Sequence, residues 1–354
     1  MMDSNNKRNR RGKPTKTRRS NARPAFSTDL DTIFATFIRD RKAEGVGQNA
    51  VNDYEYSFRY IKEYLDRVGI KHDIRNITTD IIRDYIVFMQ DEAIRFDGHK
   101  YKKDKHKQVG LSPSTINTRI KSLKTLFNRL ESDGSWPDNV LANIKQLPDP
   151  AEMIDVLTPD ELRQLLSVPD QRSYAGFRDY VIMNFLLDSM ARIGETTKLR
   201  KSDFNFESNC VTIPASVAKN RKYRIVPLSS KTIKLVEELI AENETDFTSD
   251  YVFLTNYGEP ITTGRFRTRL NQFADKTSIN KKVYPHLFRH TAATMFLQNG
   301  GDIRHLQLLL GHSDLRMVQR YTHLSNPSLT KQHGEYSVMN NILDKLEKPR
   351  KVRR

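Results

Sequence analysis

The stretch His286-Leu287-Phe288-Arg289-His290-Thr291 decides how the second half of this chain is interpreted. Residues three apart lie on one face of an α-helix, so the spacing predicts that the His286 imidazole and the Arg289 guanidinium point the same way. Four further residues of the same half complete a set of six: Arg192, Lys219, His312 and Tyr321. Tyr321 follows Gly311-His312 by nine residues, about two and a half helical turns. This order and spacing suit the metal-free cutting and rejoining of a phosphodiester.

The two arginines and the tyrosine have the properties that this chemistry requires. Attack on a phosphodiester builds negative charge on its nonbridging oxygens, and fixed cations stabilise that charge. Arg192 and Arg289 suit this task because each presents paired N–H donors to two phosphate oxygens. Tyr321 can be the nucleophile, because a phosphotyrosine bond preserves the energy of the cut ester. We therefore predict an enzyme that needs no metal, ATP or other cofactor.

Proton transfer and positioning are assigned to the remaining residues. A phenol has a pKa of about 10, so the site must take the proton of the tyrosine and must protonate the departing 5′ oxygen. His286 is the candidate base, Lys219 the candidate acid, and His312 a candidate hydrogen-bond donor to the phosphate. Glu195, one turn after Arg192, is placed to orient that arginine.

The histidine pair His286 and His290 also allows a metal-site interpretation. Histidines four residues apart bind zinc in many proteases, where a glutamate stands between them. This chain has Leu287 at that position, and Arg289 would repel a dication. We therefore predict no metal site, and His290 is interpreted as structural, as are His305 and His323.

Apolar residues recur at helical spacing in four stretches of the first half. The first helix is predicted to begin at Ser27 or Thr28 and to end at Gly45. The fourth is predicted to begin at Ser112-Pro113, because serine caps helices and proline fits their first turn. Together these helices predict an all-helical domain over residues 27–146. Residues 1–26 are basic and poor in large apolar groups, which predicts a disordered arm.

A second domain is predicted over residues 155–332, after a linker at 147–154 that contains Pro148-Asp149-Pro150. Thr158-Pro159-Asp160-Glu161 offers a capping box for its first helix. Strands at 211–213 and 223–226 predict a hairpin that carries Lys219 in its turn. The pattern is almost wholly helical after Gly264, and residues 333–354 are predicted to form a C-terminal helix and a basic tail. The predicted fold class is mainly α with a small β-hairpin or sheet.

The net charge of +16 is concentrated in a few segments. Residues 1–25 carry +8 and residues 348–354 carry +5, which leaves +3 for residues 26–347, and the loop at 98–108 alone carries +4. Flexible basic segments bind phosphate backbones without reading sequence, although solubilising or targeting tails are an alternative interpretation. Six residues are candidates for DNA contact, with a solvated surface as the alternative for the helix: Arg119, Lys121 and Lys124 on the fourth helix, and Lys100, Lys102 and Lys103 in the loop before it.

Composition excludes several other classes of protein. The single cysteine, Cys210, excludes an internal disulfide and a zinc site built from cysteines. No run of eighteen apolar residues occurs, and the basic N-terminus lacks the apolar segment of a secretory signal. We therefore predict a cytoplasmic protein that associates with the nucleoid and not with a membrane.

The motifs around the six residues resemble those of the tyrosine recombinases of the phage-integrase type, most strongly over residues 155–330. In chain order they are Ala191-Arg192-Ile193-Gly194-Glu195, Lys219 eight residues before Pro227, His286-Leu287-Phe288-Arg289-His290-Thr291, Leu310-Gly311-His312-Ser313 and Arg320-Tyr321-Thr322-His323. The helical domain resembles the family's SAM-like core-binding domain more weakly. One departure precedes Arg192: the family usually has a glycine and a larger apolar residue where this chain has Ser189-Met190-Ala191.

The resemblance implies a C-shaped clamp around duplex DNA that carries specific attachment or crossover sites. It also implies a 3′-phosphotyrosine intermediate, a homotetramer assembled on two sites, and sequential strand exchange through a Holliday junction. Residues 336–346 are then the C-terminal helix that packs onto a neighbouring subunit. The basic arm and the loop at 98–108 favour a mobile-element or prophage integrase, with accessory DNA-bending or directionality proteins as further partners.

Two alternatives use the same scaffold. A type IB topoisomerase uses nearly the same residues but relaxes DNA as a monomer. A catalytically silent DNA-binding regulator would have no need for all six residues, and the intact set argues against it.

Overall fold

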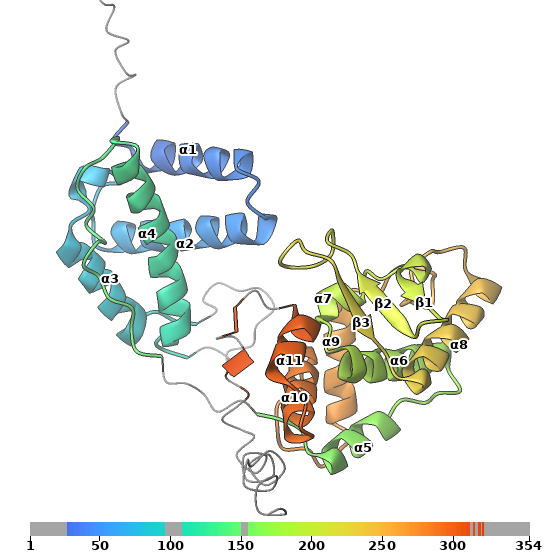
Figure 1. Ribbon diagram of the computed structural model, residues 1–354. Helices are drawn as coiled ribbons and strands as arrows, with labels where there is room; N and C mark the ends of the chain where they lie inside the picture. The colour runs from blue at the N-terminus through green and yellow to red at the C-terminus, as the bar shows by residue number, and fades with distance from the viewer. Residues whose placement is uncertain are drawn as a thin grey trace, which may run out of the picture. The chain divides into compact units, whose positions relative to one another are not determined.

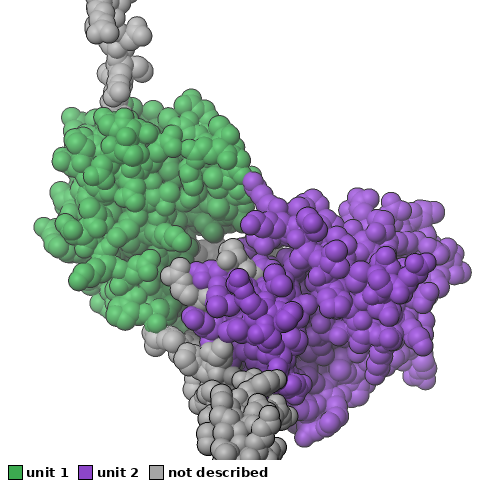
Figure 2. Space-filling model, viewed as in Figure 1, with its two compact units in different colours: residues 1–151 green, residues 152–354 purple. Residues whose placement is uncertain are grey.

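The computed structural model describes residues 27–95, 108–149, 155–311, 314–315, 318–319 and 321. The chain divides into two compact units, residues 1–151 and 152–354 (Figure 2). Several sequence predictions fall outside the described residues. They are the arm at 1–26, the loop residues Lys100, Lys102 and Lys103, most of the linker at 147–154, the residues His312, Arg320 and His323, and the C-terminal helix and tail.

The described part of the first unit is helical (Figure 1). Its elements are α1 (Leu30–Ala43), α2 (Gln48–Arg67), a 3₁₀ helix (Ile74–Asn76), α3 (Thr79–Asp91) and α4 (Pro113–Ser132). Side chains from different helices share one core, in which Leu65, Tyr85 and Ile116 have no exposed surface. The prediction of an all-helical first domain is confirmed.

Local capping explains where these helices begin. Ser112 accepts a hydrogen bond from the backbone N–H of Thr115, and Pro113 occupies the first turn of α4, as predicted. The start of α1 was predicted wrongly. Its cap is Asp29, whose carboxylate accepts the backbone N–H of Thr32. Serine, threonine and aspartate all cap helices, so residue type alone did not separate Asp29 from the adjacent Ser27 and Thr28.

The second unit surrounds a small sheet with helices (Figure 1). Its elements are α5 (Pro159–Ser167), α6 (Tyr174–Ser189), α7 (Ile193–Thr196), a 3₁₀ helix (Lys201–Asp203), β1 (Phe204–Asn205), β2 (Cys210–Ile213), β3 (Arg224–Pro227), α8 (Ser230–Asp246), α9 (Thr263–Ala274), α10 (Pro285–Gln298) and α11 (Ile303–Leu310). The capping box of Thr158 and Glu161 at α5 is present, as predicted.

The sheet has three antiparallel strands in the order β1-β2-β3, with Val211 opposite Val226. The predicted hairpin of β2 and β3 is confirmed. Strand β1 was missed, because two residues are too few to show the alternation that identifies a strand. The mainly α fold class with a small sheet is likewise confirmed. Among the described residues no helix is both long and apolar enough to cross a bilayer.

The end of α6 sets up the most important turn of the second unit. Met190 caps the helix with φ 51° and ψ 23°, the left-handed conformation that glycine adopts most easily. The chain then turns through Ala191, and Arg192 becomes the N-cap of α7. The departure from the family at Ser189-Met190-Ala191 therefore preserves the backbone geometry that a glycine would supply.

Candidate active site

Arg192 is held by the first turn of α7. Its Nη1 donates to Oε1 of Glu195 at 3.0 Å, and its backbone N–H donates to Oε2 of the same carboxylate at 3.1 Å. The glutamate is buried, while the arginine side chain keeps a 20% exposed surface. Arg192 therefore has one side fixed and another open to an anion.

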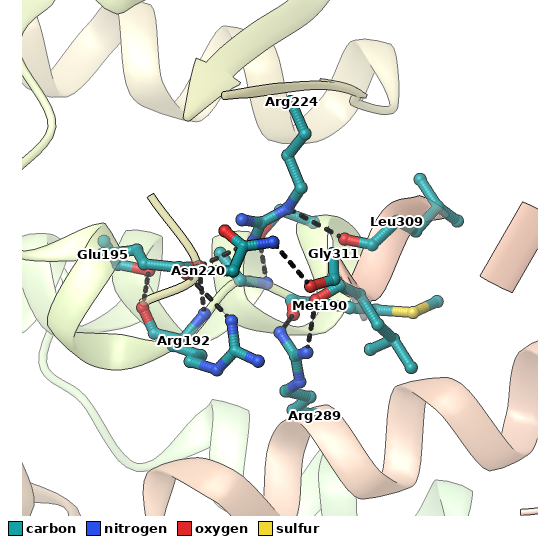
Figure 3. A network of polar contacts seen from close by, with 12 residues as sticks. Met190, Arg192, Glu195, Asn220, Arg224, Arg289, Leu309 and Gly311 are labelled. Atoms are coloured by element: carbon teal, nitrogen blue, oxygen red, sulfur yellow. Dashed lines mark hydrogen bonds and ion pairs between the residues drawn. The ribbon is translucent and has the colours of Figure 1, made fainter. Parts of the chain in front are cut away.

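Glu195 binds a second cation that the sequence analysis did not identify. Nη2 of Arg224, on β3, donates to Oε2 of Glu195 at 2.6 Å, and its Nε donates to the Leu309 carbonyl at the end of α11 at 3.1 Å (Figure 3). Burial by itself raises the pKa of the Glu195 carboxyl, but Arg224 and Arg192 outweigh it and hold that pKa below its usual value. A carboxylate therefore balances two guanidiniums at neutral pH.

A sequence signal for Arg224 did exist. Residues two apart on a strand share a face, and Arg224 shares its face with Val226, which is fully buried. A cation at such an inward position requires a buried partner, because a buried charge without a partner is costly. The sequence analysis placed Arg224 on the predicted strand at 223–226 but assigned it no role.

Arg289 lies on α10 and is buried, with 3% of its surface exposed. Nη1 donates to the Met190 carbonyl and Nη2 to the Leu310 carbonyl, both at 2.6 Å (Figure 3). Burial, reinforced by the nearby charge of Arg192, lowers the pKa of Arg289 to about 9. The guanidinium is therefore still charged at neutral pH, and two backbone carbonyls fix its plane.

His286 faces three of the cations in the predicted set. Burial of part of the ring lowers the pKa of His286, and the charges of Arg289, Arg192 and Lys219 lower it further. These effects favour the neutral form of the ring. Lys219 itself is exposed in the connection between β2 and β3. The next residue, Asn220, donates from Nδ2 to the Gly311 carbonyl at 3.0 Å and ties this connection to the end of α11 (Figure 3).

Tyr321 is 1% exposed. Its ring packs in an apolar cluster with the C-cap residue of α6, with residues of α10 and α11, and with Val318 beyond α11: Met190, Ala292, Ala293, Leu297, Leu306, Leu310 and Val318. Its hydroxyl lies 2.8 Å from Nδ1 of His290. The interpretation of His290 as a structural residue missed this contact.

Helix α11 ends at Leu310, and Gly311 follows it with φ 61°, in the left-handed region. The sequence analysis counted the nine residues from His312 to Tyr321 as about two and a half helical turns. Residues 312, 313, 316, 317 and 320 lie outside the described part of the chain, so this count stays a prediction.

The structure places the three described candidates for DNA contact on α4 of the first unit in different settings. The guanidinium carbon of Arg119 lies 3.5 Å from the centroid of the Tyr60 ring, a cation–π contact. The ammonium of Lys124 donates to the Ile144 carbonyl. Lys121 is exposed. Lys121 is therefore the member of this group whose charge faces solvent most fully.

The second unit thus brings together two fixed guanidiniums, an imidazole and a buried tyrosine on a mainly helical fold. Fixed cations of this kind can stabilise the charge that develops on phosphate oxygens.

Comparison with known proteins assigns the family. Residues 155–327 match the model of the phage integrase family, and residues 30–145 match that of the phage integrase SAM-like domain. The tyrosine recombinase XerD of Listeria innocua is 27% identical over 313 residues, which cover 87% of this chain and 98% of XerD. The tyrosine recombinase XerC of Chlamydia muridarum is 31% identical over 234 residues, 64% of this chain and 72% of XerC. The chain belongs to the phage integrase family and is a tyrosine-type site-specific recombinase, as the motifs predicted.

Solved structures share the fold. The Tn1549 transposon integrase in complex with a circular intermediate DNA has a TM-score of 0.67 and 22% identity, covering 83% of this chain and 95% of that solved chain. A lambda integrase dimer bound to a COC′ core site has a TM-score of 0.61 and 14% identity, covering 83% of this chain and 77% of that chain. The likeness supports the mainly α architecture of both domains.

Proposed function

We propose that this recombinase cuts and rejoins duplex DNA at specific sites through a 3′-phosphotyrosine intermediate, with Tyr321 as the nucleophile. The observation that carries the proposal is the link between Tyr321 and Arg289. The carbonyls of Met190 and Leu310 accept hydrogen bonds from Arg289, and both residues also pack in the apolar cluster around Tyr321. A phosphate bound by Arg289 would therefore lie beside the phenol.

The proposed cleavage of the phosphodiester by Tyr321 needs no external reagent. The phenolic oxygen of Tyr321 forms a bond to phosphorus as the bond from phosphorus to the 5′ oxygen breaks. Arg192 and Arg289 stabilise the charge on the nonbridging oxygens, and Lys219, on its exposed connection, delivers a proton to the departing 5′ oxygen. His286 is a neutral imidazole that can hydrogen-bond the phosphate or accept a proton, and His312 is proposed as a second donor to the phosphate. Attack by a 5′ hydroxyl of another strand reverses the reaction.

The proposed partner is duplex DNA, contacted through Arg119, Lys121, Lys124 and the lysines of the loop before α4. The DNA-bound complexes of the Tn1549 and lambda integrases support DNA as the partner. We further propose a homotetramer on two sites, a core-binding domain at 27–146, and a catalytic domain at 155–332. Relatedness to a transposon integrase favours a mobile-element role on cytoplasmic DNA, with accessory proteins that set direction.

A covalent capture experiment tests the proposal. The protein is incubated with nicked duplexes of randomised sequence, in which the cut releases a short strand that cannot return, and adducts are isolated under denaturing conditions and sequenced. We expect a single class of captured sites and complete loss of the adduct in Tyr321→Phe, with DNA binding retained. Persistence of the adduct in Tyr321→Phe would refute the nucleophile. Failure to capture any duplex that the protein binds would favour a DNA-binding regulator.

A second assay separates recombination from topoisomerase activity. Two duplexes that carry the captured site are mixed with the protein, and joined products are measured beside the relaxation of a supercoiled circle. We expect joined products from two duplexes. Relaxation alone would favour the topoisomerase alternative.

A further inference from the structure

We propose that His290 holds the nucleophile and takes its proton: Nδ1 of His290 accepts the phenolic hydrogen of Tyr321 when the tyrosine attacks DNA. The inference rests on the proposed role of Tyr321 and assigns the base of that reaction to His290 instead of His286. The bond from the phenolic oxygen to phosphorus then forms as the proton moves to Nδ1, and Lys219 still protonates the leaving 5′ oxygen.

The first support is direct contact. The Tyr321 hydroxyl and Nδ1 of His290 are 2.8 Å apart, which is hydrogen-bond distance for proton transfer. A phenol with a pKa near 10 is protonated at neutral pH, so the hydroxyl can donate to Nδ1 in the histidine tautomer whose Nδ1 carries no proton. In the described part of the chain, no hydrogen bond joins His286 to this hydroxyl. Geometry therefore favours His290 as the acceptor.

The second support is burial. Tyr321 is 1% exposed, and apolar side chains surround its ring, so bulk water is a poor acceptor for the phenolic proton. His290 is half-buried, and it can pass a proton onward. The protein itself must then supply the acceptor, and His290 is placed to do so because its Nδ1 contacts the hydroxyl.

The third support is that the two imidazoles of α10 lie next to different groups. Their ring centroids lie 6.5 Å apart, one helical turn, and the His290 ring lies 5.7 Å from that of Tyr321. His286 faces Arg192, Arg289 and Lys219, where the phosphate is expected to bind. One histidine therefore faces the phosphate and the other the nucleophile.

The charged groups around His290 determine how its proton affinity responds to DNA. On α10 they are His286 and Arg289. Arg192 on α7 and Lys219 in the β2–β3 connection lower the pKa of the neighbouring His286, and Glu195 and Arg224 act on the pKa of Arg289. Positive charge near an imidazole opposes its protonation. A bound phosphate diester adds a negative charge and makes proton transfer to His290 easier when substrate is present.

Asparagine provides the discriminating substitution. Its side-chain oxygen can accept a hydrogen bond near the position of Nδ1, but it cannot take a proton at neutral pH. His290→Asn therefore keeps the phenol in place and removes the base. His305→Asn is the matched control, because His305 lies on α11 with a 75% exposed side chain that pairs with Asp302. His286→Asn tests the competing assignment.

The readout is the single-turnover rate of adduct formation on the captured nicked duplex, measured against pH. In the unchanged protein we expect the rate to rise with pH and to level off once the histidine that accepts the proton is neutral. For His290→Asn we expect a rate lower by about 100-fold at neutral pH, within the usual contribution of a general base. That rate should continue to climb with pH, because the phenol must then ionise unaided.

Two chemical rescues separate a base from a merely structural residue. A fluorinated tyrosine at position 321 has a more acidic phenol and should restore much of the rate to His290→Asn. A duplex with sulfur in place of the bridging 5′ oxygen needs no acid for its leaving group, so it should rescue Lys219→Ala and leave His290→Asn slow. His290→Gln serves as a second variant if His290→Asn melts at a lower temperature than His305→Asn.

Three results would overturn the inference. The first is a wild-type rate and pH profile in His290→Asn. The second is a slow rate in His290→Asn with an unchanged pH profile and no rescue by fluorotyrosine, and the third is a loss of the levelling of the rate with pH in His286→Asn instead of in His290→Asn. Failure of the underlying function has a different signature, because Tyr321→Phe would then still form the adduct.

Discussion

Arg224→Met offers the strongest test of how the site is supported. Nη2 of Arg224 donates to Glu195 at 2.6 Å and Nε donates to the Leu309 carbonyl at 3.1 Å, while only 9% of the side chain is exposed. The charge-assisted bond is worth about 1.5–3 kcal/mol, and an unsatisfied buried carbonyl costs about 1–3 kcal/mol. Methionine fills most of the volume but replaces neither bond. The expected loss is about 3–5 kcal/mol, the usual cost of breaking a buried ion pair.

Calorimetry of the full chain measures this loss. A domain of this size shifts its melting temperature by about 2–4 °C per kcal/mol, so the transition of the second unit should fall by roughly 6–20 °C. Arg200→Ala is the control, because Arg200 is 52% exposed and pairs with Asp250 at 3.7 Å, a surface pair worth about 1 kcal/mol or less. A melting temperature for Arg224→Met that matches the control would refute the assigned role.

The pH dependence of the same variant has a definite sign. The pKa of Glu195 is lowered in the folded protein, so its contribution is fully present above the unfolded value of about 4.3 and is lost as pH falls through the folded pKa. The stability difference between wild type and Arg224→Met should therefore be largest near neutrality and should shrink below about pH 4. A difference that grows in acid would contradict the assignment.

Three further predictions concern single positions. Met190→Gly removes the strain of the left-handed backbone, which costs about 1–2 kcal/mol for a residue with a side chain. Met190→Gly should therefore unfold at a higher urea concentration than Met190→Ala, although it removes more atoms. The reverse order would contradict a strained backbone at this position. Gly311→Ala places a Cβ 3.1 Å from Cδ of Arg224 at φ +61°. It should lower thermal stability by about 1–2 kcal/mol. Gly264→Ala is the control, because a Cβ added there meets nothing within 4 Å, and its stability should be unchanged or slightly higher. Lys121→Ala should weaken DNA binding uniformly across sequences and reduce the slope of log affinity against log salt by about 1 in a salt titration. An unchanged slope would show that Lys121 does not contact DNA. Lys62→Ala is the matched control, because Lys62 pairs with Asp31.

Local chemistry made much of the fold predictable. Ser112-Pro113 and Thr158-Pro159-Asp160-Glu161 begin helices because a side-chain oxygen and a proline in the first turn act within a few residues. The hairpin of β2 and β3 followed from alternating side chains on either side of a basic turn. The cap of α1 and the two-residue strand β1 escaped prediction, because several polar residues compete for the cap and a short strand carries no periodicity.

The candidate site also has features that residue type and spacing predict and features that depend on tertiary packing. Residue types and spacing alone determined which chemistry the chain can perform, because guanidiniums, imidazoles and a phenol have fixed charge and proton affinity wherever they lie. Helical periodicity also placed His286 and Arg289 on one face of α10. The sequence could not determine which histidine meets Tyr321, or that Arg224 and Glu195 connect β3 with α7. Those contacts join residues 31 and 29 positions apart. They exist only because an apolar cluster buries Tyr321 against α10 and the sheet brings an inward cation to the carboxylate, and such packing depends on the whole domain.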